Sequence, residues 1–143
     1  YRMTDMQAAL GIVQLRRLDW VLEKKRQAAQ YYGELLSDIK DVQPPYVARD
    51  ATHTYMFYTV KFTKREVRDR VMQHLDERGI ETRVAFSPAH LQPIYRSLYR
   101  YEEGSLPVTE ECARTVLSLP IFPHIRRGDQ RTVVESSKEG LKA

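Results

Sequence analysis

The side chains with the most versatile chemistry near neutral pH are four histidines and one cysteine. The histidines lie far apart, without the close spacings that zinc ligands usually show, so the sequence predicts no metal site. The cysteine lies among charged residues of a predicted helix and is expected to pack as a small residue, not to act as a nucleophile. These residues are His53, His74, His90, His124 and Cys112.

His90 has the best case among them for binding a ligand. It lies in SPAHLQP, where two prolines restrict the backbone and can hold an imidazole in a fixed direction. A local structural hydrogen bond is the alternative, and the spacing does not decide between the two. His53 precedes a predicted strand and raises the same question with weaker support. His53 and His90 are therefore candidate substrate-binding residues.

Tyr1 and Arg2 come directly before a predicted helix start. Thr4 and Gln7 have the spacing of a capping box, which places that start near Thr4. Unpaired backbone N–H groups at a helix start favour anions, so Tyr1 and Arg2 could contact an anionic ligand. The alternative is a solvent-exposed end without a ligand, as in most domains.

The first predicted element is one long helix that runs to about Ser37, because no proline interrupts it. If the helix is kinked near Leu18, Asp19 could cap the second part. Between Ala8 and Leu22, ten of fifteen positions are apolar. A helix buried on one side would show roughly three or four in seven, so this excess predicts contacts on more than one face, with other domain structure or another subunit.

A β-α-β unit is predicted in the middle of the chain. After a connection from Asp41 to Thr52, aromatic and β-branched residues predict a strand from Tyr55 to Phe62. Thr63 and Glu66 have capping-box spacing and predict a helix that ends before Gly79. A second short strand is predicted over 80–84. The remaining predictions are short helices near 93–98 and 109–116, a strand near 117–119 and a last helix near 129–141.

These elements predict the α+β class: a small, mainly antiparallel three-stranded sheet with helices on one face, and a long N-terminal helix leading into it. Residues 1–40 form the interface helix and residues 41–143 the small domain. The net charge is +4, but basic and acidic residues alternate, which argues against a nucleic-acid partner. No apolar run approaches a membrane span, and the single cysteine suggests a reducing compartment. We expect a soluble, cytoplasmic protein.

Four segments of the chain closely resemble the DegT/DnrJ/StrS family of pyridoxal-phosphate-dependent aminotransferases, which act on nucleotide-linked keto-sugars. In order, they are YRMTDMQAALGIVQLRRLD, HTYMFYTVKF, GIETRVAFSPAHLQPIY and LPVTEECARTVLSLPIFPHI. The similarity spans almost the whole chain. It implies the C-terminal small domain of a type I aminotransferase fold, without the large domain that carries the cofactor.

The resemblance also implies roles for the candidate residues. Family members are homodimers with active sites at the subunit interface, and the segment that matches Tyr1 and Arg2 reaches the neighbouring site. His53 and His90 match histidines that are common near the substrate cleft. Ala85 and Phe86 depart from the family, where a His-Tyr pair is frequent, and this difference implies an altered sugar preference.

By the same resemblance, the full-length enzyme would transfer an amino group, from glutamate, to a nucleotide-linked keto-sugar for surface polysaccharide or glycoside biosynthesis. That chemistry needs a lysine that forms a Schiff base with pyridoxal phosphate. All seven lysines lie in charged or terminal contexts, so we expect no catalytic residue in this chain and no activity from it alone. A non-catalytic dimerising or regulatory module is the alternative. The lysines are Lys24, Lys25, Lys40, Lys61, Lys64, Lys138 and Lys142.

Overall fold

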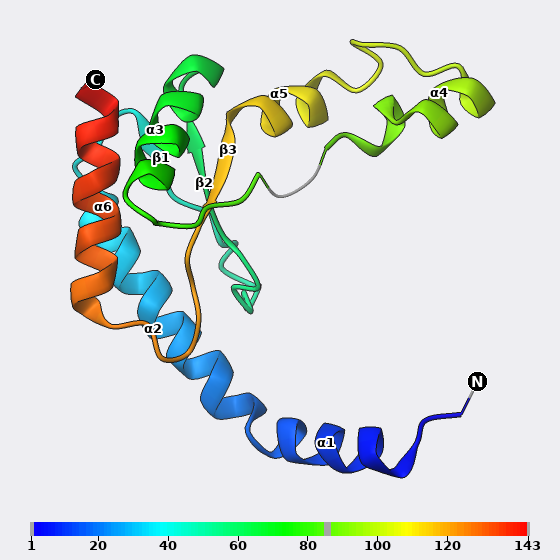
Figure 1. Cartoon of the computed structure of the whole chain (residues 1–143), viewed down its shortest axis with the longest axis vertical. Helices are drawn as coiled ribbons and strands as arrows, with labels where there is room; N and C mark the ends of the chain where they lie inside the picture. The colour runs from blue at the N-terminus through cyan, green and yellow to red at the C-terminus, as the bar shows by residue number, and fades with distance from the viewer. Residues whose placement is uncertain (1, 85–86, 143) are drawn as a thin grey trace.

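The computed structural model describes residues 2–84 and 87–142, which form an α+β arrangement of helices around a small sheet (Figure 1). Tyr1, Ala85, Phe86 and Ala143 lie outside the described residues. The strands are β1 (Val42–Gln43), β2 (Tyr58–Phe62) and β3 (Val116–Leu119). The helices are α1 (Asp5–Arg16), α2 (Leu18–Leu36), α3 (Arg65–Glu77), the short 3-10 helix η1 (Ala89–Leu91), α4 (Pro93–Tyr99), α5 (Pro107–Thr115) and α6 (Arg127–Lys142).

The sheet is antiparallel throughout, in the order β1-β2-β3. Tyr58 pairs with Leu119 and Val60 with Leu117, so the apolar residues of β2 and β3 lie on the same face. In β2 every second residue is buried, which is the period-2 pattern of a strand with one face in the core. The predicted α+β class and a small three-stranded antiparallel sheet are thus confirmed, although one of the three predicted strands does not form.

The identity of the third strand was predicted wrongly. The segment 80–84 forms no strand and contributes one isolated bridge, in which Arg83 and Ser118 exchange backbone hydrogen bonds of 3.1 and 2.7 Å. The third strand is β1, inside the segment predicted to be a connection. It is short because Pro44 follows it directly, and a proline cannot donate a ladder hydrogen bond.

The starts of β2 and α3 also differ from the predicted ones. Tyr55 has a φ of 49°, in the left-handed region, which an extended strand cannot contain, so the strand does not start at Tyr55 as predicted. A bend at residues 56–57 follows, and β2 begins at Tyr58. The N-cap position of α3 is occupied by Lys64, whose side chain makes no capping hydrogen bond. The predicted capping box of Thr63 and Glu66 therefore does not form. The helix does end before Gly79, whose φ of 70° suits a glycine.

The N-terminal capping box is confirmed. The backbone N–H of Thr4 donates to Gln7 Oε1 (3.0 Å), and the backbone N–H of Gln7 donates to Thr4 Oγ1 (3.3 Å). The long helix is interrupted at Arg17, which separates α1 from α2. Asp19 does not cap the second part, because it already lies in the first turn of α2.

The core lies between the apolar face of the sheet and helices α2, α3 and α6. The rings of Tyr32 and Tyr58 stack with their centroids 4.9 Å apart, and the Tyr32 hydroxyl donates to the carbonyl of Pro120 (3.0 Å). Burial raises the pKa of both phenols well above the ordinary tyrosine range. The buried apolar residues are Ala29, Tyr32, Leu36, Val42, Tyr58, Val60, Phe62, Val71, Leu75, Leu117, Leu119, Val133 and Val134.

Two segments extend from this core to the same side of the molecule: α1, and the segment from η1 to α4 (Figure 1). Neither α1 nor α4 contains a buried residue. The exposed large apolar side chains of α1 are Met6, Leu10, Ile12, Val13 and Leu15, and those of α4 are Ile94, Tyr95, Leu98 and Tyr99. Most of the apolar run that the sequence singles out is therefore exposed in the part of the chain that the structure describes.

Candidate functional site

The candidate residues lie on three separate segments of the chain. Arg2 is exposed and precedes α1, while Tyr1 lies outside the described residues. His53 lies in the connection between β1 and β2, and His90 lies in η1. In Figure 1 these segments surround the open side of the molecule and do not converge within this chain.

His53 is exposed, but its ring is held by a local bond. Its Nδ1 accepts a hydrogen bond from the backbone N–H of Tyr55 (2.8 Å), and the two rings lie 4.4 Å apart. An accepting Nδ1 carries no proton, so the proton of this neutral imidazole is on Nε2. His53 also lines a hollow of about 470 Å³ beside Arg26 of α2. An oriented imidazole and a guanidinium near one hollow can hydrogen-bond a polar ligand.

His90 is buried, with 7% of the residue exposed. Its Nε2 lies 3.1 Å from Glu110 Oε1, and its ring meets the edge of Tyr101 at 5.7 Å. The structural hydrogen bond considered from the sequence is therefore present. It fixes the direction of the imidazole, which ligand recognition also requires.

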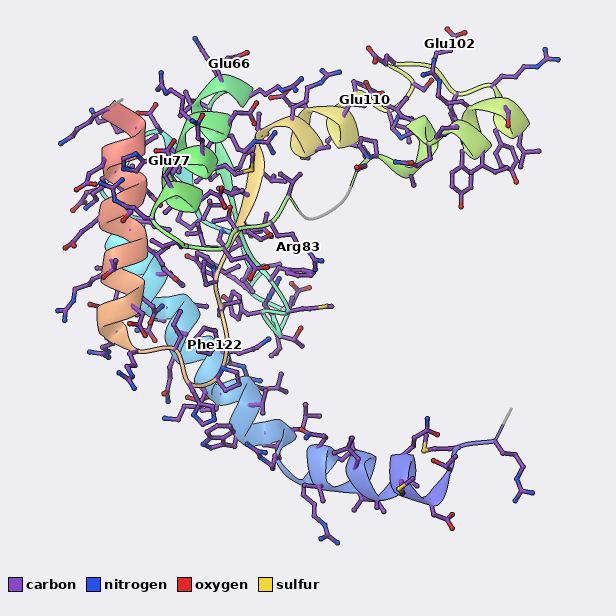
Figure 2. All side chains as sticks on the ribbon, in the orientation of Figure 1. Glu66, Glu77, Arg83, Glu102, Glu110 and Phe122 are labelled. Carbon is purple, nitrogen blue, oxygen red and sulfur yellow. The ribbon has the colours of Figure 1, made fainter. Side chains whose placement is uncertain are left out.

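Glu110 is a site residue that the sequence analysis missed. Only 3% of it is exposed, and Figure 2 shows it on α5, close to the segment that leads to α4. Its carboxylate accepts from the backbone N–H of Gly104 (2.9 Å to each oxygen), from that of Leu106 (3.2 Å) and from His90. The Gly104 hydrogen bond first, and then the His90 bond, lower the pKa of Glu110 below its ordinary value.

A sequence signal for Glu110 does exist. It lies in the first turn of a helix that opens with Pro107, where acidic side chains commonly accept from free N–H groups. The tertiary partner His90, twenty residues earlier in the chain, gives no such local signal. A carboxylate with these partners is ionised and acts only as an acceptor.

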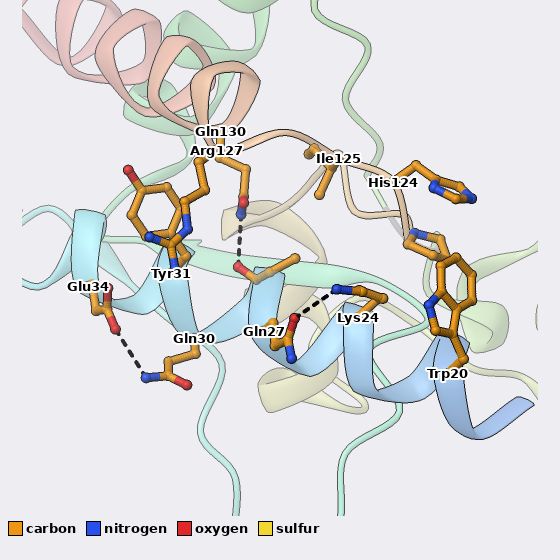
Figure 3. A pocket seen from close by; sticks show the side chains of 12 residues that line it. Trp20, Lys24, Gln27, Gln30, Tyr31, Glu34, His124, Ile125, Arg127 and Gln130 are labelled. Atoms are coloured by element: carbon orange, nitrogen blue, oxygen red, sulfur yellow. Dashed lines mark hydrogen bonds between the residues drawn. The ribbon is translucent and has the colours of Figure 1, made fainter.

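A further hollow of about 390 Å³ lies between α2 and the loop before α6 (Figure 3). The ring of Trp20 lies 5.0 Å from His124, and the guanidinium of Arg127 lies over the ring of Tyr31 at 4.9 Å. Gln130, also in its wall, donates to the carbonyl of Ala28 (2.8 Å). These groups pair with one another across the hollow and join α2 to the C-terminal part of the chain.

Among residues 2–84 and 87–142, no cluster of histidine, cysteine, aspartate and glutamate could hold a metal ion. Within the same ranges, no helix combines the length and the apolar character that a membrane span needs. Cys112 is half-buried. Each of the seven lysines is exposed or half-buried, whereas a lysine that binds a cofactor covalently is usually desolvated.

Comparison with known proteins gives one consistent family. The sequence model of the DegT/DnrJ/EryC1/StrS aminotransferase family matches residues 1–138. The chain is 37% identical over 139 residues to the dTDP-4-dehydro-2,3,6-trideoxy-D-glucose 4-aminotransferase of Saccharopolyspora spinosa, covering 96% of this chain and 34% of that protein. It is also 37% identical to a protein of Geobacillus stearothermophilus named pleiotropic regulatory protein, covering 96% of this chain and 37% of the relative.

Solved structures agree with this match. The crystal structure of DesV from S. venezuelae superposes with a TM-score of 0.90 at 35% identity, over 99% of this chain and 38% of that protein. The chain thus spans well under half the length of the relatives it matches.

Proposed function

Because the chain belongs to the DegT/DnrJ/EryC1/StrS aminotransferase family, we propose that it is the C-terminal small domain of a pyridoxal-phosphate-dependent aminotransferase. The full-length enzyme would transfer an amino group from glutamate to a keto carbon of a nucleotide-linked sugar, for surface polysaccharide or glycoside biosynthesis. The observation that carries the proposal is the family match over residues 1–138, together with relatives named as sugar aminotransferases.

The exposed helix α1 supports a role at an interface. Its apolar side chains face solvent on several sides within this chain, and apolar surfaces of this kind mark contacts with other protein. We assign residues 1–40 to contacts with the large domain and with a second subunit of a homodimer, and residues 41–143 to the small domain, to whose core α2 also contributes Tyr32 and Leu36. Tyr1 and Arg2, at the end of this helix, would reach the active site of the neighbouring subunit.

Bound pyridoxal phosphate supplies an electron sink that lets an amino group leave one substrate and join another. None of the seven lysines has the desolvated setting of a covalent cofactor site, so the proposal places the cofactor lysine outside this chain. Arg2 is exposed and charged at a helix start, which suits it to an anionic group of the cofactor or substrate. His53 and His90 would orient the sugar by hydrogen bonds.

The alternative is a non-catalytic dimerising or regulatory module. The name of the Geobacillus relative favours it, whereas the interspersed charges argue against sequence-specific DNA binding. A filter-binding assay at moderate salt separates the two: tight, sequence-selective DNA binding would support the regulatory function.

Two measurements test the aminotransferase proposal. The 143-residue chain, mixed with pyridoxal phosphate, should show no stable Schiff-base absorbance. The full-length protein that carries this chain should show it, and should transfer the amino group of glutamate to a dTDP-linked keto-sugar. A stoichiometric Schiff base on one lysine of the short chain, resistant to competing amines, would contradict the proposal.

The shared active site has its own test. An Arg2→Ala variant and a variant without the cofactor lysine should each be inactive as full-length homodimers. Mixed and re-associated, they should regain activity, because one site of each heterodimer then has both residues. Mixtures that remain inactive after confirmed subunit exchange would refute the contribution of Arg2 to the neighbouring site.

A further inference from the structure

The arm, residues 88–106, contains η1, α4 and the turn that leads into α5, and it has almost no core of its own. The structure describes every residue of the arm, and only His90 among them is buried. Rings continue outward from His90 through Tyr101 to Tyr99, with centroids 5.7 and 6.2 Å apart. A segment of this kind needs specific polar contacts to hold its direction, because apolar burial contributes little.

Those contacts meet at Glu110. Its carboxylate binds the start of the arm through Nε2 of His90 (3.1 Å) and the end of the arm through the N–H groups of Gly104 (2.9 Å) and Leu106 (3.2 Å). Gly104 has a φ of 89°, which turns its N–H inward at no steric cost. One side chain thus closes the arm at both ends.

The chemistry of the carboxylate fixes the proton on His90. An ionised carboxylate can only accept, so Nε2 of His90 must donate and must carry the proton. In the neutral imidazole Nδ1 is then the acceptor. Nδ1 makes no hydrogen bond to residues 2–84 or 87–142 in the structure.

We propose that Glu110 is a positioning residue of the enzyme: it holds His90 with the proton on Nε2, and so presents Nδ1 as an acceptor for a hydroxyl of the sugar substrate. This inference rests on the proposed function, which places His90 on the substrate side. It adds the atom that His90 uses and the residue that controls it. A purely structural role for Glu110, as a brace for the start of α5, is the competing explanation.

Glu110→Ala separates the two explanations, because it removes every acceptor that this side chain offers. Glutamine would not do so, because His90, Gly104 and Leu106 all donate to the same oxygen, Oε1, which a glutamine carbonyl can replace. Without the carboxylate, Nε2 of His90 is no longer fixed as the donor, and the proton distributes between Nε2 and Nδ1. Glu111→Ala is the matched control, since it makes the same change at the next, exposed residue.

The first readout is the ¹⁵N NMR spectrum of the histidine rings in the 143-residue chain. The signals of His90 are assigned as those that are missing from the spectrum of His90→Gln. We expect the proton on Nε2 in the wild type and in Glu111→Ala, and both tautomers in Glu110→Ala. A wild-type proton on Nδ1 overturns the proposal, whether or not Glu110→Ala folds. A proton that stays entirely on Nε2 in a folded Glu110→Ala overturns it as well.

The second readout is steady-state kinetics of the full-length protein. Glu110→Ala should raise KM for the nucleotide sugar by about tenfold, as expected for one lost hydrogen bond, with KM for glutamate unchanged. Equal loss with both substrates, or no loss, would contradict the positioning role. A wild-type protein without aminotransferase activity would refute the proposed function instead, whereas the proton position on His90 is measured independently of activity.

Discussion

A leucine-to-alanine substitution, made separately at two positions, distinguishes a side chain that stabilises the fold of this chain from one that lies in an interface. Leu75 of α3 is fully buried in the core, whereas Leu10 of α1 is 62% exposed. Leu75→Ala should lower the free energy of unfolding by about 2–5 kcal/mol, because it removes buried methyl groups and leaves a cavity. Leu10→Ala should change it by less than about 0.5 kcal/mol.

The interface prediction follows from the same exposure. Leucine has three more carbons than alanine, each worth about 0.8 kcal/mol when buried. Since 62% of Leu10 is exposed in the chain, full coverage by a partner would stabilise association by about 1.5 kcal/mol per leucine. Leu10→Ala should therefore weaken self-association by about tenfold, or more if both copies lie in the interface.

Chemical denaturation measures the first quantity, and sedimentation over a range of concentrations measures the second. Each variant should change one of these quantities and not the other. Leu75→Ala changes the unfolding midpoint, and Leu10→Ala changes the dissociation constant. A Leu10→Ala variant as unstable as Leu75→Ala would show that α1 packs within the chain. A wild-type chain that stays strictly monomeric at high concentration would refute α1 as a self-association surface.

Three further predictions concern single side chains. Gly140→Ala should lower the free energy of unfolding, measured by denaturation, by about 1–3 kcal/mol, because the added Cβ would lie 3.1 Å from two carbon atoms of α3. Gly33→Ala should raise the free energy of unfolding by about 0.5–1 kcal/mol, because its added Cβ would have no atom within 4 Å. Equal effects of the two substitutions would refute the close approach of Gly140 to α3. Gln130→Ala should lower the free energy of unfolding by about 0.5–1.5 kcal/mol, because the buried hydrogen bond from Gln130 to the carbonyl of Ala28 is lost; an unchanged unfolding midpoint would contradict this. The pKa of Glu110 is lowered from its ordinary value of 4.5, so the stability that its ionised carboxylate contributes is complete above that pH and is lost as the pH falls through the lower pKa of the folded chain. The amide chemical shift of Gly104, measured by NMR, should therefore titrate below pH 4.5. An inflection above that pH would refute a lowered pKa of Glu110.

Local signals in the sequence were sufficient for most helices. The capping box of Thr4 and Gln7, Gly79 after α3 and Pro93 at the start of α4 act within one turn of chain, so their sequence patterns predict the ends directly. The central strand β2 also follows from composition alone, apart from its first residues. Its start depends on the left-handed Tyr55, a conformation that the residue type does not reveal.

The sheet edges depended on contacts between distant segments. β1 has two residues and no pattern of its own, and it exists because β2 offers a free edge to Val42 and Gln43. The segment 80–84 looks more like a strand, but it meets β3 only at the pairing of Arg83 with Ser118. Strand pairing is decided by the partner, so short edge strands are the least predictable part of this fold.

The candidate site divides in the same way. The sequence by itself indicated the family and the α+β class, because residue types, spacings and periodicity are properties of the chain. For the same reason it named His53, His90, Tyr1 and Arg2 as candidates and predicted a partner for the apolar first helix. Only the tertiary structure joined His90 to Glu110, twenty residues apart, and left the surface of α1 uncovered. Hydrogen bonds between segments and the exposure of a helix face depend on how distant parts of the chain pack, and no local pattern of residues encodes them.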